Sequence, residues 1–81
     1  MTCISRRDGE LAIEQVLLDT IAEQQGTPCY VYSRAAISEA FQSYANALQG
    51  QDHLICYAVK ANSNLAVLNV LAGLGSGFDI V

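Results

Sequence analysis

The chain has 81 residues and a formal net charge of −4, with 52% hydrophobic and 15% charged residues. This composition excludes a disordered acidic tail, because such segments are poor in apolar residues. The length is below that of a typical domain, so we expect the N-terminal piece of a longer protein. The four basic residues form no stripe and no apolar run reaches membrane-spanning length, so we expect neither nucleic acid nor a membrane as a partner.

The three cysteines offer no metal site or disulfide framework. Cys3, Cys29 and Cys56 are odd in number and widely spaced, with no CxxC pair among them. His53 is the only histidine, and we expect it at the surface. A zinc site needs several such ligands at short spacing, so we expect no bound metal. Reduced thiols of this kind are typical of a cytoplasmic protein.

The first 26 residues combine a hairpin signal with a helix. Asp8-Gly9 lies between the strand-like runs 3–7 and 10–14, and both turn positions tolerate positive φ. Apolar residues at helical spacing predict a helix over residues 17–25. Gly26 is suited to the position just after the end of that helix.

The next segment predicts a short strand followed by an amphipathic helix. Residues 29–32 are β-prone, and Ser33 is a suitable N-cap for the helix, which ends by Gly50. Apolar residues at helical spacing form one stripe along this helix. We interpret the aromatic side chains of the stripe as core residues and not as ligand-stacking residues. The stripe comprises Ile37, Ala40, Phe41, Tyr44, Ala45 and Leu48.

The last third of the chain predicts a strand, a helix and a second strand. Residues 54–59 form a continuous apolar run, typical of a strand that is buried on both faces. Residues 62–64 supply turn and N-cap side chains for a buried helix over residues 65–74. Residues 78–81 begin a second buried strand. Two strands joined in this way require parallel pairing and a right-handed crossover.

The glycines at positions 73, 75 and 77 have the spacing of a phosphate loop. They follow a helix and precede a strand, however, which is the reverse of the order in a dinucleotide-binding fold. We therefore interpret them as a helix C-cap and a tight turn.

Lys60 is the candidate reactive residue. It follows the strand at residues 54–59, and by alternation it shares a face with Ala58, whose small side chain leaves room beside it. Ligands bind at the carboxyl ends of parallel strands, and a lysine in a partly apolar pocket is a nucleophilic amine suited to Schiff-base chemistry. The alternative is a strand-end lysine that extends into water. The local pattern leaves both interpretations open.

Several segments resemble one enzyme family. Residues 57–64 (YAVKANSN), then Val67-Leu68 and residues 75–81 (GSGFDIV), resemble the N-terminal part of the diaminopimelate decarboxylase family. That family belongs to the pyridoxal-phosphate-dependent decarboxylases of alanine racemase-like fold. Residues 26–33 and 8–11 resemble the same family, so the resemblance covers nearly the whole chain.

The resemblance implies an α/β fold. It is the N-terminal portion of a (β/α)8 barrel, preceded by a short β-hairpin segment that belongs to a second β-domain. Residues 1–26 would form the N-terminal hairpin and helix, as part of the β-domain. Residues 27–81 would start the pyridoxal-phosphate-binding barrel, truncated after its second strand.

The resemblance also implies a reaction and a cofactor. The reaction is decarboxylation of meso-diaminopimelate to lysine through a pyridoxal 5′-phosphate Schiff base on Lys60. Ala58 matches a small residue that lines the cofactor pocket, and Asp79 matches an acid at the end of the second barrel strand. By alternation Asp79 shares a face with Val81 and could point into the barrel. The residues alone leave open that Asp79 only caps a neighbouring element.

The implied partners are a small amino-acid substrate and a second subunit, since the full-length protein would be a cytoplasmic homodimer. The 81-residue chain by itself should be inactive. Related decarboxylases of ornithine, arginine or carboxynorspermidine remain an alternative, because only Ala61, Ser63 and Ile80 favour the diaminopimelate branch. A non-catalytic homologue that acts as a binding module is another, although the presence of Lys60 argues against it.

Overall fold

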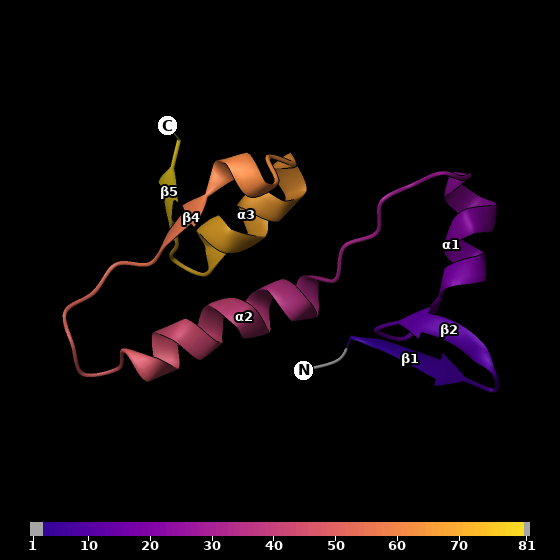
Figure 1. Cartoon of the computed structure of the whole chain (residues 1–81), viewed down its shortest axis with the longest axis horizontal. Coiled ribbons are helices and arrows are strands. Elements are labelled where there is room, and N and C mark those ends of the chain that lie inside the picture. Colours follow the sequence, from indigo (N-terminus) through magenta and orange to yellow (C-terminus); the bar gives the residue numbers. More distant parts are fainter. Residues whose placement is uncertain (1–2, 81) are drawn as a thin grey trace. The chain divides into compact units, whose positions relative to one another are not determined.

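The computed structural model describes residues 3–80 and forms two compact units, Met1–Ala36 and Ile37–Val81 (Figure 1). Val81, which was included in the predicted second buried strand, lies outside the described residues. No helix within residues 3–80 is long and apolar enough to cross a membrane. The elements are β1 (Ile4–Arg7), β2 (Glu10–Ile13), β3 (Val16–Leu17), α1 (Leu18–Gln25), α2 (Arg34–Ala47), β4 (Cys56–Ala58), the 3-10 turn η1 (Val59–Ala61), α3 (Leu65–Gly73) and β5 (Gly77–Asp79).

The N-terminal unit is built on a tight hairpin. β1 pairs antiparallel with β2, and Arg7 lies opposite Glu10. Between them Asp8 (φ 53°) and Gly9 (φ 84°) both have positive φ, as a two-residue type I′ turn requires. The predicted hairpin is therefore confirmed.

A third strand and a helix complete this unit. β3 pairs antiparallel with β2, and its two residues are too few to produce a recognisable alternation in the sequence. α1 ends as predicted at Gly26 (φ 78°), whose N–H donates to the Ala22 carbonyl at 2.9 Å. Ala12 of β2 is fully buried, and β2 contacts α1.

The segment between α1 and α2 contains no strand, so the strand predicted at residues 29–32 is wrong. Tyr30 and Tyr32 are exposed instead, and their rings stack with centroids 6.4 Å apart and planes 8° from parallel. A β-prone run becomes a strand only where a partner supplies hydrogen bonds to its backbone. None of the described strands pairs with this run.

Two side chains cap the start of α2. Ser33 is the predicted N-cap, and its buried hydroxyl accepts the Ala36 N–H at 3.0 Å. The same hydroxyl donates to Glu14 Oε2 at 2.8 Å, and the Ala35 N–H donates to that oxygen at 3.3 Å. Because the Ser33 hydroxyl and then the Ala35 N–H stabilise the carboxylate, they hold the pKa of Glu14 below its ordinary value. The Ser33 cap is confirmed, whereas the contribution of the Glu14 carboxylate to the cap was not predicted.

The C-terminal unit contains a strand–helix–strand arrangement. β4 and β5 pair in parallel and α3 connects them, so the predicted order of elements and the parallel pairing are confirmed. Asn64 caps α3, because its Oδ1 accepts the N–H groups of Ala66 at 2.9 Å and Val67 at 3.4 Å. This is the N-cap chemistry expected of residues 62–64.

α3 ends in a cap that depends on a glycine. The Gly75 N–H donates to the Ala72 carbonyl and the Ser76 N–H donates to the Leu71 carbonyl, each at 3.1 Å. These two bonds define a Schellman motif, and Gly75 takes its left-handed position at φ 94°. The glycine-rich run at residues 73–77 is therefore a helix C-cap, as interpreted from its order in the sequence.

The strands of this unit are shorter and more exposed than predicted. The strand expected at residues 54–59 is reduced to β4, Leu54 is 72% exposed, and Cys56 is exposed. α3 buries only Val67 and Leu71. Burial on both faces is therefore wrong for the described residues. β4 has one sheet partner there, and its residues 56 and 58 are exposed and half-buried.

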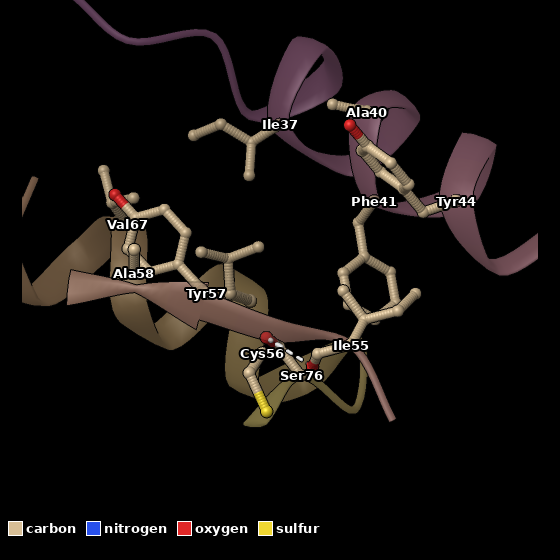
Figure 2. A pocket seen from close by; sticks show the side chains of 11 residues that line it. Ile37, Ala40, Phe41, Tyr44, Ile55, Cys56, Tyr57, Ala58, Val67 and Ser76 are labelled. Carbon is tan, nitrogen blue, oxygen red and sulfur yellow. Dashed lines mark hydrogen bonds between the residues drawn. The ribbon is translucent and has the colours of Figure 1, made fainter. Parts of the chain in front are cut away.

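The apolar stripe of α2 lines a cavity in the same unit. The cavity has a volume of about 320 Å³, and Ile37, Phe41 and Tyr44 contribute to its wall from α2. Figure 2 shows these side chains across the cavity from Tyr57 and Val67. α2 buries none of these residues, and Tyr44 is 66% exposed, so the predicted core position of Tyr44 is wrong.

The Glu14 carboxylate, which is hydrogen-bonded to the start of α2, should make the stability of the protein depend on pH. A carboxyl group whose pKa is lowered by folding stabilises the protein above its ordinary pKa, and this contribution is lost as pH falls through the lowered value. We expect Glu14→Gln in the full-length protein to lower the thermal unfolding midpoint at about pH 7, and the difference from wild type to shrink at about pH 4. Glu23→Gln, an exposed change of the same charge on α1, is the control. A difference that stays constant with pH would contradict this role of Glu14.

The glycines of the α3–β5 segment should respond to alanine in opposite ways. A Cβ at position 77 would lie 2.9 Å from Cys56 Sγ, closer than such contacts occur, whereas a Cβ at Gly73 meets nothing within 4 Å. Gly77→Ala should lower the free energy of unfolding by up to about 1 kcal/mol, because Cys56 Sγ is the end of an exposed side chain that can rotate away at a modest cost. Gly73→Ala should raise it by up to about 1 kcal/mol, because alanine favours helix.

Urea unfolding of the full-length protein measures both effects. Adding Cys56→Ala to Gly77→Ala removes the sulfur atom, so the double variant should recover most of the loss. An equal loss with and without Cys56 would show that the contact is not the cause.

Candidate functional site

The residues predicted for the site lie at one edge of the β4–β5 pair. Ala58 is the last residue of β4, Asp79 is the last residue of β5, and the two are partners across the parallel pair. Lys60 follows Ala58 by two residues. Because the strands are parallel, this is the carboxyl edge of both, the edge at which α/β proteins bind ligands. The fold thus brings Ala58 and Asp79 side by side and places Lys60 just beyond them in the chain.

Lys60 lies in a turn and not on the strand. β4 ends at Ala58, and Lys60 is the middle residue of η1, where its side chain is exposed. The Asn62 N–H donates to the Val59 carbonyl at 3.2 Å and closes this turn. The strand alternation used to orient Lys60 is therefore wrong, because the extended backbone stops before it.

The two faces of the strand pair differ in the size of their side chains. Tyr57 lines the cavity together with Val67, and Phe78 lies beside Leu68, so these two aromatic residues face α3. Side chains alternate along a strand, so their neighbours occupy the opposite face. By this alternation that face carries Cys56, Ala58, Gly77 and Asp79, and Cys56 and Ala58 also line part of the cavity.

Sequence reasoning missed the packing role of Gly77. It was interpreted as part of a helix C-cap and a tight turn, and it is also the first residue of β5, where it lies opposite Cys56. Any side chain at position 77 would meet Cys56 Sγ. The sequence contains no signal for this role, because it does not show that Gly77 lies opposite Cys56.

Three further residues hold the turn that carries Lys60. The Tyr57 hydroxyl donates to the Asn62 carbonyl at 2.9 Å, and Asn62 Oδ1 accepts the Asn64 N–H at 3.0 Å. The asparagines were recognised in the sequence as turn residues. The contribution of Tyr57 had no sequence signal, because this tyrosine stands within an apolar run.

The functional groups at this edge fit a cofactor that carries an aldehyde. Lys60 is the only lysine of the chain, and a primary amine condenses with an aldehyde to an imine. Ala58 and Gly77 leave the surrounding face open, and Asp79 adds a carboxylate. Residues 3–80 contain no group of three or more His, Cys, Asp or Glu side chains that could hold a metal ion.

The chain is similar to known decarboxylases over its full length. It is 63% identical over 81 residues to diaminopimelate decarboxylase of Pseudomonas aeruginosa, covering 100% of this chain and 20% of that protein. It is 58% identical over 76 residues to the Vibrio cholerae diaminopimelate decarboxylase, covering 94% and 18%. The crystal structure of diaminopimelate decarboxylase from M. jannaschii with L-lysine matches with a TM-score of 0.91 at 36% identity, over 96% of this chain and 19% of that chain. The chain therefore spans about a fifth of the length of these relatives.

A family model matches the part of the chain that carries the candidate site. The model describes the pyridoxal-dependent decarboxylase, pyridoxal binding domain, and it matches residues 34–81. This range begins with α2 and includes the β4–β5 pair and the turn that carries Lys60. The chain therefore belongs to the pyridoxal-dependent decarboxylase family, and residues 34–81 lie in its pyridoxal-binding domain.

Proposed function

We propose that the protein containing this chain converts meso-diaminopimelate into L-lysine and carbon dioxide in the cytoplasm, with pyridoxal 5′-phosphate at the carboxyl edge of β4–β5. The observation that carries the proposal is the position of Lys60. It is the single lysine of a chain that is 63% identical to the P. aeruginosa diaminopimelate decarboxylase, and it stands on the turn at the ligand-binding edge.

The same proposal assigns each segment a place in the complete fold. Residues 1–26 would belong to a β-domain, and residues 27–81 would start a (β/α)8 barrel whose first two strands are β4 and β5. Parallel pairing and a helix on one face support this assignment, because barrel strands carry their helices on the outside. The small residues on the opposite face would then line the interior. A homodimer is part of the proposal and rests on the family resemblance.

Lys60 has two roles in this proposal. Its Nζ would hold the cofactor covalently in the resting protein and, once released, would hold or deliver a proton beside the substrate α-carbon. When bound, pyridoxal phosphate supplies an electron sink for the bond that breaks at that carbon. The bond to the carboxylate breaks, carbon dioxide leaves, and a proton takes its place.

Ala58 and Asp79 would shape the pocket around the amine. Ala58 is half-buried and lies directly opposite Asp79, so a larger side chain at position 58 would fill space beside Asp79 at the carboxyl edge of the pair. Asp79 would contribute negative charge and hydrogen-bond acceptors at the same edge. Both residues are assigned to binding and orientation of the cofactor.

The assignment of Lys60 predicts where the cofactor is attached. Borohydride reduction of the full-length protein, followed by peptide mapping, should place the pyridoxyl group on the peptide that contains Lys60. Lys60→Arg keeps the positive charge but offers no amine that forms an imine at neutral pH, so it should remove the label. A label on another lysine would contradict the assignment.

The substrate is tested by the release of carbon dioxide. The full-length wild type with pyridoxal phosphate should act on meso-diaminopimelate faster than on ornithine or arginine. Lys60→Ala should reduce the rate by roughly 10²–10⁴-fold, the range for loss of a proton-transfer group. His53→Gln, at an exposed position before β4, is the control and should leave the rate unchanged.

Two results separate the parts of this proposal. Faster turnover of ornithine or arginine by the wild type would overturn the choice of substrate and leave the role of Lys60 intact. Full activity in Lys60→Ala would overturn the role of Lys60.

A further inference from the structure

The turn that carries Lys60 is too short to be held by its own backbone. η1 contains three residues, and the Asn62 N–H donates to the Val59 carbonyl at its end. Isolated 3-10 turns have poorer hydrogen-bond geometry than α-helices. The backbone of Lys60 therefore needs support from outside the turn if its side chain is to start from a defined point.

Tyr57, the middle residue of β4, supplies this support. Its half-buried ring lines the apolar cavity beside Val67, as Figure 2 shows. From there its hydroxyl reaches over the turn and donates to the Asn62 carbonyl at 2.9 Å. Lys60 lies between the two residues that this bond joins. The turn is thus held by its own backbone and by the tyrosine hydroxyl.

Asn62 also connects the turn to the following helix. Its Oδ1 accepts the Asn64 N–H at 3.0 Å, and Asn64 Oδ1 in turn accepts the first free N–H groups of α3. A chain of hydrogen bonds therefore runs from the Tyr57 hydroxyl to the start of α3. Displacement of the turn would break the bond from Tyr57 and disturb the cap of α3.

We propose that Tyr57 is a positioning residue, whose hydroxyl fixes the turn from which Lys60 reaches the cofactor. This inference rests on the proposed function, because it takes Lys60 as the lysine that holds pyridoxal phosphate. Side chains alternate along a strand, so the Tyr57 side chain leaves β4 on the face opposite that of its neighbour Ala58, the partner of Asp79. It therefore acts through the backbone of the turn.

The hydroxyl and the ring of Tyr57 have separable effects. Phenylalanine would fill the same part of the cavity, so Tyr57→Phe keeps the apolar contacts with Val67. The Asn62 carbonyl that loses its donor belongs to a half-buried residue and can turn to water. Loss of the hydroxyl should therefore affect the placement of Lys60 more than the stability of the fold.

The test compares Tyr57→Phe with Tyr44→Phe in the full-length protein. Tyr44 lines the same cavity from α2 but is 66% exposed. Tyr44→Phe therefore removes one phenolic hydroxyl from the same cavity and serves as the matched control. In the cofactor-free protein, hydrogen exchange at the Asn62 amide should be faster in Tyr57→Phe and unchanged in Tyr44→Phe. Equilibrium dialysis should show pyridoxal phosphate binding about two- to tenfold more weakly in Tyr57→Phe, the range set by one hydrogen bond. kcat should fall while KM for diaminopimelate changes less.

The outcomes distinguish this inference from the proposed function. A pyridoxyl label on Lys60 in the wild type, with equal exchange and equal cofactor affinity in both variants, would overturn the role of Tyr57 alone. A wild type that is labelled on a different lysine would overturn the proposed function. A Tyr57→Phe protein that fails to fold would also overturn the inference, because the hydroxyl would then be needed for the fold and not for placing Lys60.

Discussion

The parallel pairing of β4 with β5 is the constraint on which the candidate site depends. Parallel strands cannot be joined by a tight turn, so the chain returns through α3 and leaves both strand ends at one edge. The register then sets Ala58 against Asp79. A shift by one residue would place Phe78 opposite Ala58 and turn Asp79 toward the helix. In this register Gly77 leaves room for the Cys56 side chain, because a Cβ at position 77 would lie 2.9 Å from Cys56 Sγ.

Polar side chains at the helix starts link elements that are distant in the sequence. In the N-terminal unit Glu14 stands in the β2–β3 turn at φ 56°, a left-handed conformation that costs a non-glycine residue roughly 1–2 kcal/mol. Its carboxylate receives hydrogen bonds from Ser33 and Ala35 at the start of α2, where the helix dipole also favours negative charge. These interactions stabilise that conformation. The sheet and the first turn of α2 are thereby joined within this unit.

Three of the features that were predicted correctly depend on residues close together in the chain. Asp8-Gly9 determines its turn, Ser33 caps the helix that follows it, and Gly75 ends α3. The features that were missed depend on a partner elsewhere. The strand expected at residues 29–32 has no pairing neighbour among the described strands, and the carboxylate of Glu14 reaches a helix well beyond its own turn. Propensity identifies such segments but does not supply their partners.

The position of Lys60 on a turn also changes how its side chain is held. On a strand, its backbone would be fixed by ladder bonds and its direction by alternation. On η1, the fixed points are Val59, Asn62 and the Tyr57 hydroxyl, and none of these bonds involves the Lys60 side chain. In the proposed function the lysine amine must hold the cofactor and later leave it, so its stem must move while its Cα stays in place. A turn whose backbone is held by the Tyr57 hydroxyl keeps the Lys60 Cα in place and leaves the Lys60 side chain able to move. A sequence can reveal the lysine, but the anchor for its backbone becomes visible only when Tyr57 is seen to reach across the turn.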